Sequence, residues 1–270
     1  MHDNNKNNSN NYHLAKEISS WSSVSSAKLC SSQGQDVVRW FVEALKVFDV
    51  GVGSVLLAVG YFDRVWTAME LGDKVMDVAA ACLWVAVKFN EDLGRGEPKW
   101  SEVMRFSGVE DAESEESRRT LVVAEKLVLK CLEWDLNRKS EFELFFSLKE
   151  SFDPAGHLPE KGSADEAKRL CVEALLDVQR FGKFPAHEKA AALLVIVAHK
   201  ESPRKSDEAL GFLRRMGLNG SRVSDVVEEF GRSRAERAEQ DGAERANKRQ
   251  RRYDPCNVNP FLCVGASALA

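Results

Sequence analysis

The chain has 270 residues, of which 44% are hydrophobic and 30% are charged, and its formal net charge is −4. This length and hydrophobic content suffice for one large domain or two of ordinary size, each with its own core. No stretch reaches the ~18 uninterrupted apolar residues of a membrane-spanning helix, and the amino terminus lacks the apolar core of a signal peptide. We therefore expect an intracellular globular protein with no membrane partner and no global attraction to nucleic acid.

The six cysteines are scattered along the chain and form no Cys-x-x-Cys pair. Cys82 and Cys131 fall inside apolar helical stretches, which is typical of small reduced core residues. His187-Glu188 resembles the start of a zinc-protease helix, but no second His follows four residues after His187. The sequence therefore predicts no disulfide framework, no metal site and no cofactor.

The first 137 residues predict a polar arm followed by a helical bundle. Residues 1–30 are rich in Asn and Ser and are too polar to build a core. The apolar positions then keep the helical period through five segments, at about 35–48, 54–66, 74–91, 100–106 and 117–132. The third segment carries Ala79-Ala80-Ala81 at its centre, and small side chains let neighbouring helices approach closely. We expect this helix in the middle of a bundle that covers 31–137.

A second set of helices is predicted after residue 137, and no alternating strand pattern competes with them. Five helical segments follow, at about 142–148, 164–180, 185–199, 206–216 and 221–238. The central one again has a run of small residues, Ala190-Ala191-Ala192. The prediction is an all-α chain with a second, divergent bundle over 138–238 and a flexible tail with a basic cluster over 239–270.

Lys88 and Glu125 stand out because each is a charged side chain inside an otherwise apolar helical stretch. Such a charge must face solvent or a partner rather than the core. The segments that contain these two residues, 79–91 and 125–136, resemble the cyclin box together with segment 57–64, which includes Tyr61-Phe62-Asp63-Arg64. This resemblance implies two five-helix bundles in tandem, and a regulatory subunit, itself no enzyme, that binds and activates a cyclin-dependent serine/threonine kinase, in cell-cycle control.

The resemblance also implies which residues contact the kinase. In cyclins the Lys and the Glu at these two positions bind the backbone near the end of a kinase helix and turn that helix into its active position. The residues at matching positions around them are Phe89, Glu91, Leu129, Trp134 and Leu136. Asn90 departs from the acid that the family carries there, which bears on kinase affinity or kinase choice.

Two structural features of the family are altered in this chain. In cyclins the Asp of the Asp63-Arg64 dipeptide pairs with an Arg at the start of the first helix, but Gly34 occupies that position here. Either this Asp–Arg pair is lost here, or Arg39, from another turn of the same helix, serves as the partner of Asp63. Some partner is expected, because a buried carboxylate without one is costly. Trp40, a structural residue, also belongs to the family's docking patch for substrate or inhibitor peptides. Val37 and Val75 fit that patch, but Gln33, Asp36 and Gly72 do not, so the sequence does not favour docking.

Two short motifs lie outside this framework. Residues 129–133 match Leu-x-Cys-x-Glu, by which some cyclins bind retinoblastoma-type pocket proteins, but that mode needs an extended segment and the match lies in a helix. The cluster Lys248, Arg249, Arg251 and Arg252 is typical of a nuclear import signal, which predicts a nuclear protein with a cytoplasmic pool.

Two alternatives from other functional classes stay open at this point. One is a cyclin-fold scaffold that has lost its kinase, which the altered positions Asn90 and Gly34 favour and the retained Lys88 and Glu125 oppose. The other is a transcription factor of the same fold that binds DNA directly. The acidic stretch over 110–116 argues against that reading, because DNA binding needs basic faces.

Overall fold

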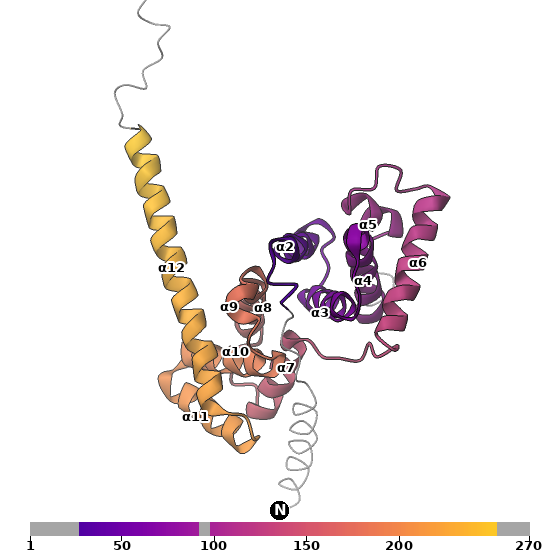
Figure 1. Ribbon diagram of the computed structural model, residues 1–270. Coiled ribbons are helices and arrows are strands. Elements are labelled where there is room, and N and C mark those ends of the chain that lie inside the picture. Colours follow the sequence, from indigo (N-terminus) through magenta and orange to yellow (C-terminus); the bar gives the residue numbers. More distant parts are fainter. Residues whose placement is uncertain (1–26, 92–97, 253–270) are drawn as a thin grey trace, which may run out of the picture. The chain divides into compact units, whose positions relative to one another are not determined.

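The computed structural model describes residues 27–91 and 98–252, with side chains through residue 245. All regular structure in these residues is helical, which confirms the all-α prediction (Figure 1). The described residues up to 227 form one compact unit, and those from 228 on form another. The predicted polar arm lies largely in residues 1–26, outside the described part of the chain. No described helix is both long and apolar enough to cross a membrane.

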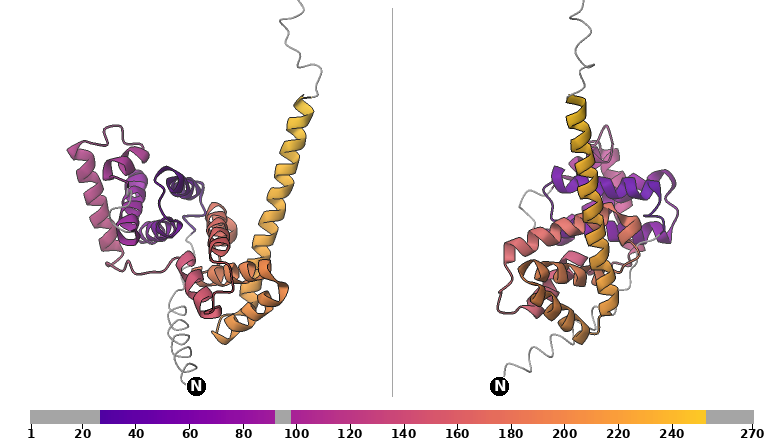
Figure 2. Two further views of the ribbon diagram at one scale, coloured as in Figure 1. Left: turned by 180° about the vertical axis from the view of Figure 1, so that it is seen from behind. Right: turned by 90° about the vertical axis from the view of Figure 1, so that its left-hand side faces the viewer.

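The first group of helices is built around α4. The elements in this group are α2 (Ser32–Val47), α3 (Val52–Ala68), the 3₁₀ turn η1 (Gly72–Lys74), α4 (Val75–Asn90), α5 (Trp100–Phe106) and α6 (Glu115–Cys131). Helix α4 contacts all four of the other α-helices in the group. Its Ala79, Ala80 and Ala81 are fully buried, as their small size predicts for a central helix. Figures 1 and 2 show α6 running alongside α4.

Helix boundaries in this group follow from local hydrogen bonding. Ser31 accepts a hydrogen bond from Gly34 N at 3.1 Å, and Ser114 accepts one from Ser117 N at 3.1 Å. Each hydroxyl thereby satisfies a backbone N–H that has no partner within its helix. Glu115 and Glu116 add negative charge to the first turn of α6, where it opposes the positive end of the helix dipole.

The second group repeats this organisation around α10. Its helices are α7 (Glu141–Phe152), α8 (Glu160–Leu176), α9 (Val178–Phe181), α10 (Ala186–Glu201), α11 (Pro203–Arg215) and the start of α12 (Gly220–Arg252). Helix α10 contacts α7, α8 and α11, and its run of three alanines is fully buried. Contacts of α2 and α3 with α7 and α8 join the two groups within the first unit.

Two predicted segments in the second group have different bounds in the structure. The helix expected over 164–180 begins earlier, at Glu160, and is interrupted at Asp177, whose side chain accepts from Arg180 N at 3.2 Å and starts α9. An aspartate favours this alternative because its carboxylate competes with the helical backbone bonds. Helix α12 continues past residue 238 to Arg252, so the tail that was expected to be flexible over 239–270 is helical over 239–252. The Ala, Glu, Arg and Lys residues of that stretch are strong helix formers.

Candidate functional site

Lys88 and Glu125 meet on the surface where α4 lies against α6. Lys88 is in the last turn of α4, and its Nζ donates to Glu125 Oε1 across the two helices. The Lys88 ammonium also lies 5.3 Å from the centre of the Trp84 ring. The side chains are 39% and 19% exposed, respectively, so the pair is accessible from one side only. The two most conspicuous charges of the sequence therefore form a single exposed ion pair.

Several apolar side chains on α4, on α6 and just beyond α6 are exposed or half-buried. Phe89, the next residue after Lys88, is 48% exposed, and Trp134, just beyond α6, is 72% exposed. Leu129 and Leu136 are half-buried. Sequence reasoning missed Val122, which is 39% exposed and lies three residues before Glu125, on the same stripe of α6 as Glu125 and Leu129. Exposed apolar side chains next to a charged pair are typical of a protein-binding surface.

The carboxylate of Glu91, another predicted contact residue, is held by the first turn of α3. Its Oε1 accepts from Gly51 N at 2.8 Å and from the Ser54 hydroxyl, so it caps the first turn of α3. A Cβ on Gly51 would lie 2.9 Å from that oxygen, so glycine is what allows this approach. Glu91 therefore acts within the protein, and the sequence carried no signal of this role because Glu91 and α3 are far apart along the chain.

Asn90 extends the same network. Its Nδ2 donates to Ser54 Oγ at 2.9 Å. Turned over, the same amide accepts from Ser54 N and donates to Glu143 Oε1 of α7, both at 3.3 Å. In the first orientation the amide nitrogen donates to Ser54 Oγ, which itself bonds the Glu91 carboxylate. In the second it donates directly to the Glu143 carboxylate. The departure from the family's acid at position 90 thus has a local explanation, since a third carboxylate would be repelled there.

The chain leaves α6 through a turn in left-handed backbone conformation. Glu133 N donates to Lys130 O at 3.1 Å and Trp134 N donates to Leu129 O at 3.0 Å, which together form a Schellman motif. Glu133 and Trp134 have φ angles of 54° and 60°. Such angles favour glycine, and no glycine is present in this turn. The sequence therefore gave no signal of this conformation.

Tyr61 and Arg64 of α3 bind the turn from beneath. The Tyr61 hydroxyl donates to Leu136 O at 2.7 Å, and Arg64 donates to Asp135 O at 3.0 Å and to Leu132 O at 3.3 Å. Burial, and secondarily the charge of Glu143, raises the pKa of Tyr61 well above its usual range, so its hydroxyl keeps the proton that it donates. Burial, with the neighbouring Arg138, lowers the pKa of Arg64.

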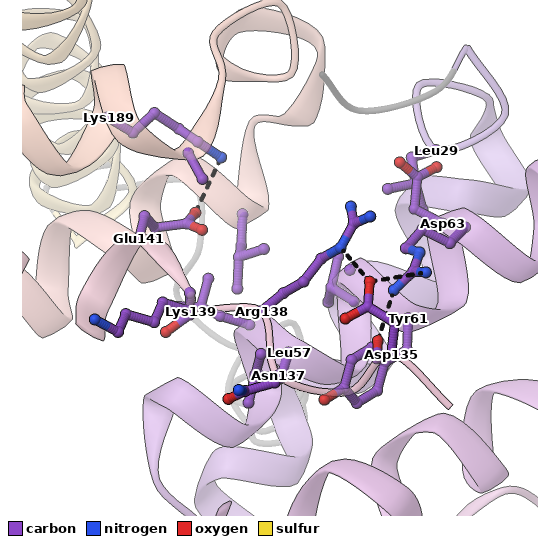
Figure 3. A pocket seen from close by; sticks show the side chains of 17 residues that line it. Leu29, Leu57, Tyr61, Asp63, Asp135, Asn137, Arg138, Lys139, Glu141 and Lys189 are labelled. Atoms are coloured by element: carbon purple, nitrogen blue, oxygen red, sulfur yellow. Dashed lines mark hydrogen bonds and ion pairs between the residues drawn. The ribbon is translucent and has the colours of Figure 1, made fainter. Parts of the chain in front are cut away.

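A pocket of about 380 Å³ lies beside this turn and is lined from both groups of helices (Figure 3). Ion pairs line it: Lys189 with Glu141 at 3.0 Å, and Arg138 with Asp135 at 3.1 Å. Apolar lining comes from Leu57 of α3 and Leu175 of α8, among others. Within the described residues no three His, Cys, Asp or Glu side chains gather as metal ligands would.

The expected partnership between Arg39 and Asp63 is wrong. Arg39 is exposed and pairs with Asp36 on its own helix at 2.7 Å, because the two side chains are three residues apart on one face of α2. Gly34 cannot be replaced by a larger residue in this conformation, since a Cβ would lie 2.4 Å from Lys28 O. The chain therefore passes too close to the start of α2 for the arginine that cyclins carry there.

The residues of the docking patch differ in exposure, and its apolar members pack inward. Val37 and Val75 are buried, while Gln33, Asp36 and Gly72 are exposed. Trp40 stacks on Phe106 with ring centres 5.0 Å apart and donates Nε1–H to Phe106 O at 3.0 Å. Leu129 and Cys131 of the Leu-x-Cys-x-Glu match lie in α6, which is not the extended form that the motif needs.

Comparison with known proteins agrees with this geometry. The family model for the cyclin N-terminal domain matches residues 9–137, which include α2 to α6 and the turn after it. This is a cyclin-box protein. Among solved structures it is similar to a viral cyclin from herpesvirus saimiri, with a TM-score of 0.56 and 14% identity, over 74% of this chain and 84% of that one. A search of the curated proteins finds no significant match. The fold of this cyclin-box protein is therefore that of cyclins.

Proposed function

We propose that this cyclin-box protein is a non-catalytic regulatory subunit that binds and activates a cyclin-dependent serine/threonine kinase, in cell-cycle control. The observation that carries the proposal is the half-exposed Lys88–Glu125 pair at the junction of α4 and α6, with Phe89 next to Lys88 in the chain and Trp134 just beyond α6 also exposed. The pair occupies the positions that contact the kinase in cyclins.

The pair suits a partner that offers backbone groups. In the free protein the ammonium and the carboxylate neutralise each other, and a half-exposed pair of this kind contributes ~0–1 kcal/mol to stability. Charged hydrogen bonds to a partner are worth ~1.5–3 kcal/mol each once water is excluded, so exchanging the internal bond for two external ones favours binding. Phe89, Trp134 and Val122 provide the apolar area that excludes the water.

A pull-down followed by a kinase assay tests this proposal. The bait is the wild-type chain or the variant Lys88→Glu with Glu125→Ala, and the expected result is that only wild type retains an active kinase. A matched control changes Lys46 and Glu43, an exposed ion pair on α2 with an N–O distance of 3.0 Å, and is expected to retain the kinase. Retention of no kinase by wild type would contradict the proposal and would favour a scaffold.

We further propose that Lys248, Arg249, Arg251 and Arg252 direct nuclear import. They lie in the last turns of α12, and their side chains are outside the described part of the structure. A dense basic cluster is what import receptors bind. Replacing all four by Ala in a fluorescent fusion is expected to move the protein from the nucleus to the cytoplasm. An unchanged distribution would overturn the assignment.

A further inference from the structure

The turn that follows α6 combines backbone strain with an exposed tryptophan. Two successive non-glycine residues, Glu133 and Trp134, occupy the left-handed region, which costs each of them ~1–2 kcal/mol. The strained residue Trp134 is also the most exposed large apolar side chain in the described part of the chain. Strain of this kind persists only where the surrounding structure imposes it, and it concentrates at functional sites.

The contacts that impose the left-handed conformation on this turn come from one face of α3. Arg64 Nη1 donates to Asp135 O at 3.0 Å, its Nη2 donates to Leu132 O at 3.3 Å, and Nη2 lies 3.6 Å from Asp135 Oδ2. Tyr61 holds Leu136 O at 2.7 Å. The two side chains are one helical turn apart, so they grip the turn on both sides of Trp134. Figure 3 shows Tyr61 and Asp135 together at one edge of the pocket, with dashed lines marking the bonds to Asp135.

Arg64 also has an electrostatic reason to be there. The carbonyl of Leu132 is at the carboxyl end of α6, where the helix dipole is negative, and the Asp135 carboxylate adds a full negative charge. A guanidinium can bind the two carbonyls and approach the carboxylate at once, because its donors form a rigid fork. A lysine has the charge but lacks the fork.

We propose that Arg64 and Tyr61 are positioning residues that hold the turn over 132–136 in its left-handed form and thereby present Trp134 to the kinase. This inference rests on the proposed function. It assigns Arg64 a role on the binding surface although its side chain lies under that surface. Since Arg64 acts through Trp134, its contribution to binding disappears when the Trp134 ring is removed.

The test is a double-mutant cycle on kinase affinity. Arg64→Ala and Trp134→Ala are each expected to weaken binding about tenfold, and the double variant is expected to bind no worse than Trp134→Ala alone. Amide hydrogen exchange without kinase gives a second readout: the N–H groups of Glu133 and Trp134 lose protection in Arg64→Ala. Arg138→Ala is the matched control, because Arg138 binds the same Asp135 carboxylate at 3.1 Å and its side chain bonds neither Leu132 O nor Asp135 O. It is expected to leave both readouts unchanged.

The outcomes separate this inference from the proposed function. Two results would overturn the inference and leave the proposed function standing. In one, Arg64→Ala binds the kinase as tightly as wild type. In the other, Arg64→Ala weakens binding by the same factor whether or not Trp134→Ala is also present. Failure of wild type to bind any kinase would overturn both. Should Arg64→Ala not fold, Arg64→Lys keeps the charge without the fork, and it is expected to show the same coupling to Trp134.

Discussion

At the scale of single residues, two carboxylates are held in different ways: Glu125 pairs with Lys88 between α4 and α6, and Glu91 caps the first turn of α3. Lys88 and Glu125 were identifiable from the sequence because a charged side chain in an apolar helical stretch cannot be buried without a partner, so it must face solvent or another protein. Their pairing with each other was not predictable, since it depends on how α4 packs on α6. The same holds for Glu91, which resembles a contact residue in sequence but caps α3 in the structure.

Asn90 offers a direct test of this residue-level account. Asn90→Asp is expected to lower the free energy of unfolding by about 1–2 kcal/mol, because it replaces a donor to Ser54 or Glu143 by a third carboxylate. The measurement is urea unfolding at neutral pH. Adding Glu143→Gln should recover part of the loss, since Gln preserves the capping box that Glu143 forms with Ser140. Equal stability of Asn90→Asp and wild type would show that the amide network is not needed.

At the scale of helices, most of the architecture follows from patterns that the sequence displays. The helical period located the helices, and the two alanine runs located α4 and α10 at the centres of their groups. The end of α6 could not be predicted in the same way. A Schellman motif usually has glycine at its left-handed position, which makes it recognisable in a sequence. Here Glu133 occupies that position, because contacts from α3 hold the turn.

Substitution of that residue by glycine measures the strain. Glu133→Gly is expected to raise the free energy of unfolding by about 0.5–1 kcal/mol, because glycine adopts φ near 54° without a Cβ clash. Urea unfolding checks this, with Lys130→Gly in the last turn of α6 as the opposite control, expected to destabilise by ~1 kcal/mol. A destabilising Glu133→Gly would mean that the turn carries no strain.

At the scale of the whole molecule, the cyclin fold was predictable and the details that adapt it were not. The resemblance to cyclins rested on three short sequence segments within residues 57–136. The structure and the comparisons both agree with the predicted cyclin fold. The family's Arg–Asp pair is altered at the arginine: Gly34 lets the chain approach the start of α2, and Arg39 pairs locally with Asp36. These exchanges depend on tertiary contacts, which a single sequence does not display.

We propose that the Lys88–Glu125 pair faces a kinase rather than serving only to join α4 to α6. The most direct measurement is the affinity of the charge-swapped variant, Lys88→Glu with Glu125→Lys, for the kinase that wild type retains. The swap keeps an internal ion pair, loses only the contact of Lys88 with Trp84, and is expected to shift Tm by no more than about 4 °C. Each swapped charge is then repelled by the partner group that the original side chain would bind. We therefore predict at least a hundredfold loss of affinity, or about 2.7 kcal/mol. A folded swap variant that binds the kinase as tightly as wild type would contradict the account.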